Sequence, residues 1–384
     1  MNDASRTGYG PGSPTSTESG TLVLTPFTSR ANSISQPSST DISSGPLDLT
    51  LLSTTSWRQP YPSIGQFAMT DSEEVVAAGP NGLFYFKRVQ DHPATPWSEP
   101  RPFPNTQVTL NALTVSGLAL YRETVSRLLL YCVSGGVLHS FYLTDENSSF
   151  IPNNSPPLAS YKVMGMPTVV KNGYSSGDGW SLVVPSQSGG LLHTSKSTQW
   201  KAVDHLATDL GIISAFSVTA LRNYPKTEET ELVAVCISRG QLNVVQGPLR
   251  LGSMTSSWLG KTSTRILCPG EVTGNPALIS ERYYDQKAQI DLLVPSVEGG
   301  IFHFVRTQST PNDWHMIGRI AFPQNIPPAS CLSFHFRPTT YPNREMYALV
   351  QIGGRLYYVS TTREDVPWYN ARLNPITHPG PFLL

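Results

Sequence analysis

The sequence predicts an all-β fold, a six-bladed β-propeller with four antiparallel strands in each blade, and seven blades are the alternative. Three features of the 384 residues support this fold. Glycine-led apolar strands recur at a nearly constant interval, an aromatic ring follows each of them, and another short apolar segment precedes each of them. Long helices are not expected, because the chain is rich in glycine (30) and proline (33) and only 14% charged.

The glycine-led strands define the repeat. They begin at intervals of 54, 54, 50, 60 and 54 residues, at Gly82, Gly136, Gly190, Gly240, Gly300 and Gly354. Each glycine ends a turn such as SGG, VEGG or IGG, where a positive φ lets the chain reverse tightly, and a β-branched or aliphatic run precedes it. The centre of each unit is therefore predicted to be a β-hairpin.

Two further strands complete each unit. Short apolar segments precede the hairpins at 64–69, 113–120, 166–170, 212–221, 275–280 and 330–336. Tryptophans follow the hairpins as Trp97, Trp200, Trp258, Trp314 and Trp368, and the second unit has Phe150 near the corresponding place. A large ring at this position is expected to fill the wedge between adjacent blades near the rim.

The chain is divided into a disordered tail at 1–44 and a single propeller domain at 45–384. Serine, threonine, glycine, proline and asparagine dominate the tail, which cannot bury enough apolar surface to offset its ordering entropy. Residues 45–57 (GPLDLTLLSTTSW) are expected either to complete the final blade or to form part of a seventh. No secretory signal or membrane-spanning run is recognised, so we expect a soluble cytoplasmic protein without membrane contact.

Charge and motifs exclude several classes of function. Basic and acidic residues balance at 27 each, so no broad positive field favours nucleic acid as a partner. The four cysteines lack a CxxC spacing and are predicted to be mainly buried free thiols. His139, His193 and His303 lie in separate repeats and are predicted to be structural, so no metal site is expected. Hydrolase, nucleotide, zinc and calcium motifs are not found, and no cofactor is predicted.

One repeat carries a family resemblance. Residues 274–314 (GNPALISERYYDQKAQIDLLVPSVEGGIFHFVRTQSTPNDW) resemble the repeat of bacterial and fungal propellers that include fucose-binding six-bladed lectins. The resemblance extends over 45–384 and implies sugar binding. Such a lectin would repeat an arginine, a carboxylate and an aromatic residue in every blade. Here one polar position instead varies through Tyr85, His139, His193, Asn243, His303 and Tyr357. This variation favours one site at the mouth of the central channel.

A cofactor-free, lectin-like propeller also resembles the fungal hetero-Diels-Alderases that join a tropolone-derived quinone methide to a sesquiterpene such as humulenol. No short motif carries this resemblance, and no catalytic residue is transferred by it. The favoured hypothesis is therefore a pericyclase of secondary metabolism that acts on small hydrophobic substrates. A fucose-type carbohydrate-binding lectin and a protein-interaction scaffold are the alternatives. The oligomeric state is left open.

The innermost strand of each blade supplies the candidate site residues. Lys171, Arg282 and His335 are predicted to donate hydrogen bonds to an oxyanion that develops on the substrate. Met69, Tyr121, Arg222, Glu281 and Phe334 are predicted to bind and shape the substrate. The competing interpretation of each residue is ordinary channel packing or a solvated charge at the rim.

Overall fold

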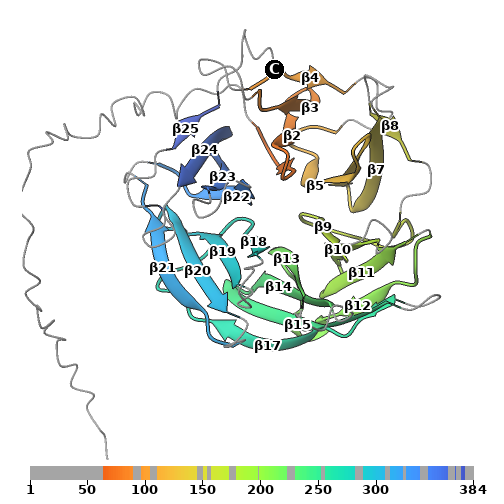
Figure 1. The fold of residues 1–384 in the computed structure, drawn as a ribbon, viewed down its shortest axis with the longest axis vertical. Helices are drawn as coiled ribbons and strands as arrows, with labels where there is room; N and C mark the ends of the chain where they lie inside the picture. Colours follow the sequence, from red (N-terminus) through yellow and green to blue (C-terminus); the bar gives the residue numbers. More distant parts are fainter. Residues whose placement is uncertain are drawn as a thin grey trace, which may run out of the picture. The chain divides into compact units, whose positions relative to one another are not determined.

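The described residues form a ring of β-sheets around a central axis (Figure 1). The computed structural model describes residues 64–376 apart from 90–96, 104–109, 145–149, 154–156, 173–178, 198, 223–229, 252–255, 282–288, 308–311, 323–325, 338–344, 362–367 and 369–372. The strands form six sheets, and each sheet is built from consecutive strands of the chain. The predicted six-bladed propeller is thereby confirmed. The predicted tail at 1–44 and the segment 45–57 lie outside the described residues.

The six sheets are named blades 1 to 6 in chain order. Blade 1 contains β1 (Phe67–Met69), β2 (Glu74–Gly79), β3 (Gly82–Lys87) and β4 (Arg101–Pro102). Blade 2 contains β5 (Val115–Thr124), β6 (Arg127–Ser134), β7 (Val137–Thr144) and β8 (Ile151–Pro152). Blade 3 contains β9 (Thr168–Lys171), β10 (Trp180–Pro185), β11 (Leu191–Lys196) and β12 (Asp204–Leu206).

The second half of the chain repeats this plan. Blade 4 contains β13 (Ala215–Arg222), β14 (Thr230–Ser238), β15 (Gln241–Leu251), β16 (Ser256–Trp258) and β17 (Lys261–Ile266), and a short 3-10 helix at Thr208–Leu210 precedes it. Blade 5 contains β18 (Ala277–Glu281), β19 (Gln289–Pro295), β20 (Ile301–Thr307) and β21 (His315–Ile320). Blade 6 contains β22 (Ala329–Arg337), β23 (Glu345–Ile352), β24 (Arg355–Thr361) and β25 (Asn374–Pro375).

Neighbouring strands within each blade are antiparallel, and the first strand of each blade lies innermost. The predicted apolar segments ahead of the hairpins are these inner strands. Blade 4 departs from the plan, because β15 pairs with both β16 and β17, with a bulge at Val244/Val245. The hairpin glycines adopt the positive φ that the turns require, for example 77° at Gly136 and 87° at Gly300.

The hydrophobic core consists of clusters that each join two adjacent blades. Each cluster includes the large aromatic ring that follows the hairpin of the later blade. The rings are Phe150 between blades 1 and 2, Trp200 between 2 and 3, Trp258 between 3 and 4, Trp314 between 4 and 5, Trp368 between 5 and 6, and Trp97 between 6 and 1. The prediction that these rings fill the wedges between blades is confirmed. Blade-to-blade packing therefore fixes the positions of the inner strands.

Contacts between blades 6 and 1 close the ring. The Ile64 N–H donates to the Gly354 carbonyl at 2.7 Å, and Gln351 Nε2 donates to the Ile64 carbonyl at 2.8 Å. The Tyr347 hydroxyl donates to the Asp71 carbonyl at 3.0 Å. Within the described part of the chain, no helix has the length and hydropathy needed to cross a bilayer.

The four cysteines are free thiols. Cys132, Cys236 and Cys331 are buried in the core, and Cys268 is half-buried. Burial raises the pKa of Cys132 to about 12, which keeps its thiol protonated and unreactive at neutral pH. The prediction of mainly buried free thiols is confirmed.

Candidate functional site

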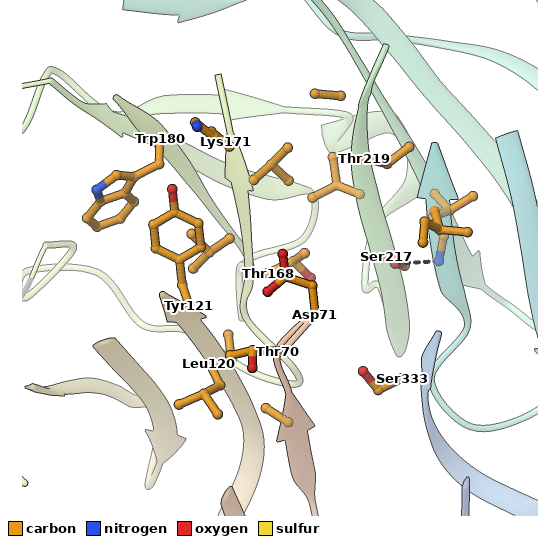
Figure 2. Close-up of a pocket in the computed structure, with 18 of the residues that line it drawn as sticks. Thr70, Asp71, Leu120, Tyr121, Thr168, Lys171, Trp180, Ser217, Thr219 and Ser333 are labelled. Atoms are coloured by element: carbon orange, nitrogen blue, oxygen red, sulfur yellow. Dashed lines mark hydrogen bonds between the residues drawn. The ribbon is translucent and has the colours of Figure 1, made fainter. Parts of the chain in front are cut away.

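A cavity of about 1050 Å³ lies where the inner strands meet. All six blades contribute to its wall, through residues of β1, β5, β9, β13, β18 and β22. The volume is at the upper end of typical small-molecule pockets, which are roughly 300 to 1,000 Å³. The wall combines apolar side chains with serine and threonine hydroxyls (Figure 2).

Five of the eight predicted site residues line this cavity. They are Met69, Tyr121, Lys171, Phe334 and His335. Met69 and Phe334 are buried, Tyr121 and His335 are half-buried, and Lys171 is exposed. The structure thus brings two of the three predicted donors, Lys171 and His335, to one cavity.

The other three predicted residues are not part of the described wall. Arg222 and Glu281 are the last residues of β13 and β18, and their side chains lie outside the described part of the structure. Arg282 lies outside the described residues. Roles for all eight residues in catalysis or binding stay predictions.

One corner of the cavity, between blades 2 and 3, gathers aromatic and charged side chains. We call Tyr121, Glu123, Lys171 and Trp180 the corner site. The ring centroids of Tyr121 and Trp180 are 5.8 Å apart, and Trp180 is only 4% exposed, so Tyr121 is the ring that faces the cavity (Figure 2). Burial, assisted by Glu123 and Asp71, raises the pKa of Tyr121 to about 12. Its hydroxyl therefore keeps its proton and can donate a hydrogen bond at neutral pH.

Cations surround the single carboxylate of the corner site. Glu123 lies 3.2 Å from Arg127 and 3.5 Å from Lys196. The Lys196 ammonium is 5.6 Å from the Trp180 ring centroid and 6.0 Å from that of Trp200. A cation, a carboxylate and aromatic rings therefore come together at this blade boundary, and the group opens into the cavity.

The opposite wall presents a serine that is hydrogen-bonded to a histidine. Ser333 Oγ and His335 Nε2 are 2.8 Å apart, and the His335 ring stacks on Tyr347. Burial lowers the pKa of His335 to about 4, while Asp71, Glu73 and a backbone hydrogen bond to Met69 raise it less strongly. Either atom of this pair can be the donor, because the neutral ring can carry its proton on either nitrogen.

Related groups occur at other blade boundaries, where each arginine already donates to a protein acceptor. Arg88 pairs with Glu73 at 2.7 Å and donates to the Tyr358 hydroxyl at 2.9 Å, between blades 6 and 1. The Arg122 guanidinium binds both oxygens of Glu74 between blades 1 and 2.

The boundary between blades 4 and 5 contains a third such group. Arg306 is 1% exposed, donates to Gln246 Oε1 at 2.6 Å and lies over the Trp314 ring, 5.7 Å from its centroid. Comparing one position at a time between the sequence repeats does not reveal these arginine groups, because an arginine and the residue it binds often come from different blades.

A chain of serine, histidine and aspartate in blade 3 resembles a hydrolase triad but is buried. His193 Nε2 lies 3.0 Å from Ser181 Oγ, and His193 Nδ1 lies 3.1 Å from Asp204 Oδ2. Ser181 and His193 are fully buried, and Ser181 Oγ donates to Asn172 Oδ1 at 2.6 Å. This chain ties strands together and offers no accessible nucleophile.

His303 is also structural. It is fully buried, lies 2.8 Å from Asp291 and accepts a hydrogen bond from Trp368 Nε1 at 3.0 Å. The structural roles predicted for His193 and His303 are confirmed. Among the described residues, no group of three histidine, cysteine or acidic side chains could hold a metal ion.

Sequence reasoning missed the acidic and indole members of the cavity wall. Asp71 follows β1 and Glu123 lies near the end of β5. Trp180 begins β10 and is not part of the once-per-blade aromatic series. The position of Trp180 outside this series could have identified it as a wall residue, since a tryptophan outside the repeat has a different role from the wedge-filling rings.

Comparison with known proteins identifies related folds only. No family model and no curated protein matches the chain. A mutant of AofleA from Arthrobotrys oligospora has a TM-score of 0.55 at 10% sequence identity, over 81% of this chain and 86% of that one. A mutant of the Aleuria aurantia lectin in complex with alpha-methyl-L-fucoside has a TM-score of 0.51 at 13% identity, over 83% and 97%.

A third similar structure is the SapL1 lectin in complex with alpha methyl fucoside. Its TM-score is 0.51 at 11% identity, over 84% of this chain and 98% of that chain. At such low identity these similarities establish a lectin-like propeller fold and carry no site residue to this chain.

Proposed function

We propose that this protein is a carbohydrate-binding propeller with its saccharide site at the corner site of the axial cavity. The observation that carries the proposal is the convergence of an aromatic ring, hydrogen-bond donors and a carboxylate at an open part of the wall. A sugar ring presents C–H groups on its face and hydroxyls at its edge, which suit an aromatic platform flanked by polar groups. The fold is shared with lectins whose structures contain methyl fucosides.

The proposal predicts one principal site instead of one site per blade. At the other three blade boundaries described above, the arginine is committed to protein acceptors, and a sugar would have to replace those contacts. The charged and aromatic groups of the corner site line the cavity of about 1050 Å³. Binding should therefore saturate at about one ligand per chain.

Calorimetric titration with a panel of methyl glycosides, methyl α-L-fucoside among them, tests this function. We expect Tyr121→Ala to weaken binding by about tenfold or more, since stacking on an aromatic ring is worth roughly 1 to 3 kcal/mol. Tyr161→Ala is the matched control, because Tyr161 is 39% exposed and lies outside the cavity wall. Absence of binding by every glycoside to folded protein contradicts the proposal.

The second candidate is the cofactor-free hetero-Diels-Alderase that joins a tropolone quinone methide to a sesquiterpene polyene. The observation that favours it is the apolar part of the same wall, where Met69, Leu120 and Phe334 line the same cavity as the donors Tyr121 and Lys171. A cavity of about 1050 Å³ has room for two reactants. Its test is accelerated, stereoselective adduct formation on incubation with both reactants. A rate and stereochemistry equal to those without protein would exclude it.

A further inference from the structure

The corner site and the charged residues beside it, Arg127, Lys196 and Asp71, together carry an excess of positive charge. Arg127 and Lys196 share one carboxylate, that of Glu123, at 3.2 and 3.5 Å. Lys171 adds a third cation at the corner site, and Asp71 adds a second carboxylate, since both carboxylates act on the Tyr121 hydroxyl. Among the described residues, three cations against two carboxylates leave one positive charge without a counter-charge.

Lys171 supplies the charge that no group in the described part of the protein offsets. It is the last residue of β9, its side chain is exposed, and it has no ion-pair or hydrogen-bond partner among the described residues. Figure 2 shows its ammonium on the same side of the cavity as the Tyr121 ring. The neighbouring Arg122 does not contribute, because its guanidinium is engaged by Glu74. An ammonium beside an aromatic platform is suited to a ligand that carries an anionic group next to a sugar face.

We infer that the corner site prefers a saccharide bearing a carboxylate, a hexuronate, whose carboxylate pairs with Lys171 while its ring lies on Tyr121. This inference rests on the proposed carbohydrate-binding function and names its ligand class. The preference arises from charge, so it weakens as salt is added, because an exposed ion pair is screened within about 8 Å at physiological ionic strength.

Two matched ligands test the inference on the full-length protein. Methyl β-D-glucuronide and methyl β-D-glucoside differ only in the carboxylate or hydroxymethyl group at C6. We expect the glucuronide to bind about fivefold to twentyfold more tightly, and Lys171→Gln to remove this difference by weakening glucuronide binding. Lys261→Gln is the control, because Lys261 is an exposed lysine on β17 outside the cavity wall.

A second variant is expected to change glucuronide affinity in the opposite direction. Glu123→Gln removes the carboxylate that Arg127 and Lys196 share, so both cations become available to the ligand. We expect glucuronide affinity to rise by about twofold to fivefold, from simple Coulomb attraction at high effective dielectric constant. Thermal unfolding of each variant confirms that the fold is retained.

The possible outcomes distinguish failure of the hexuronate preference from failure of the proposed carbohydrate-binding function. Equal affinities of the wild-type protein for the two ligands overturn the hexuronate preference and leave saccharide binding in place. A preference that survives in Lys171→Gln also overturns it, because the carboxylate then binds elsewhere. Failure of both ligands and of the whole glycoside panel to bind overturns the carbohydrate function and the inference together.

Discussion

At the scale of single residues, His335 connects the chemistry of the cavity wall with stability. Burial lowers its pKa to about 4, against an ordinary value of 6.5, so the folded protein keeps the ring neutral where the unfolded chain protonates it. A lowered histidine pKa contributes stability that is fully present above pH 6.5 and is lost as the pH falls toward 4.

We therefore predict that the free energy of unfolding falls between pH 6.5 and 4 partly through His335. Each pKa unit corresponds to about 1.4 kcal/mol, so the contribution is on the order of 2 to 3 kcal/mol at most. Asp71 and Glu73 face the same ring and weaken the shift. Urea unfolding at pH 7, 5.5 and 4.5 measures the loss. His335→Gln, which cannot titrate, should show a shallower decline, and an identical slope in both proteins contradicts the prediction.

At the scale of elements, close backbone approach explains one glycine that the repeat does not require. Gly117 lies in β5 at an ordinary negative φ, yet a methyl group there would overlap the Gly165 carbonyl and Met166 Cα of the next blade. The absence of a side chain lets β5 lie directly against the segment that leads into β9. Packing between blades 2 and 3, and thus the corner site, depends on this contact.

We predict that Gly117→Ala destabilises the protein by about 1 to 3 kcal/mol, the usual cost of overpacking against backbone that cannot move away. The comparison variant is Gly135→Ala, where φ is 59° but nothing lies within 4 Å of the added methyl group. That substitution should cost only about 1 kcal/mol of left-handed backbone strain. Unfolding of both variants in guanidinium chloride measures their free energies of unfolding. Equal values would show that the blades adjust to the methyl group.

The elements themselves were predictable because their causes are local. A glycine at positive φ ends the turn of each hairpin, and a wedge-filling ring recurs once per blade. The period of these residues therefore located the hairpins and most of the inner strands. The boundary groups were not predictable in this way. Arg122 reaches Glu74 across 48 residues and Lys196 reaches Glu123 across 73, and no fixed spacing along the chain encodes such pairs.

Site residues could be predicted from the sequence only where a position on an inner strand is enough to put the residue on the cavity wall. The inner strands border the axis, and Met69, Tyr121 and Lys171 line the cavity because they lie on β1, β5 and β9. Asp71 lies in a turn and Trp180 on the second strand of its blade, so their place in the wall depends on how blades pack. That packing is set by many weak contacts and is not visible in one repeat.

At the scale of the whole molecule, the ring has one junction of a different kind. Within the described residues the chain passes directly from each blade to the next, except between blade 6 and blade 1. That junction is held by side-chain packing and hydrogen bonds, such as the bond from the Tyr347 hydroxyl to the Asp71 carbonyl. A covalent link limits how far the other blade pairs can separate, so the entropy gained on local opening is largest at this junction.

We predict that Tyr347→Phe increases hydrogen exchange in blades 1 and 6 together, because losing one hydrogen bond costs about 0.5 to 1.5 kcal/mol and the junction opens more often. Thr230→Val is the control, since the Thr230 hydroxyl donates to the Asn172 carbonyl at 2.8 Å between blades 3 and 4, which the chain links directly. Native-state exchange followed by mass spectrometry should show joint exposure of blades 1 and 6 in the first variant. In the control the change should stay near its own boundary. If Tyr347→Phe changes exchange equally in all blades, the ring unfolds as one unit and the closing junction is no weaker than the rest.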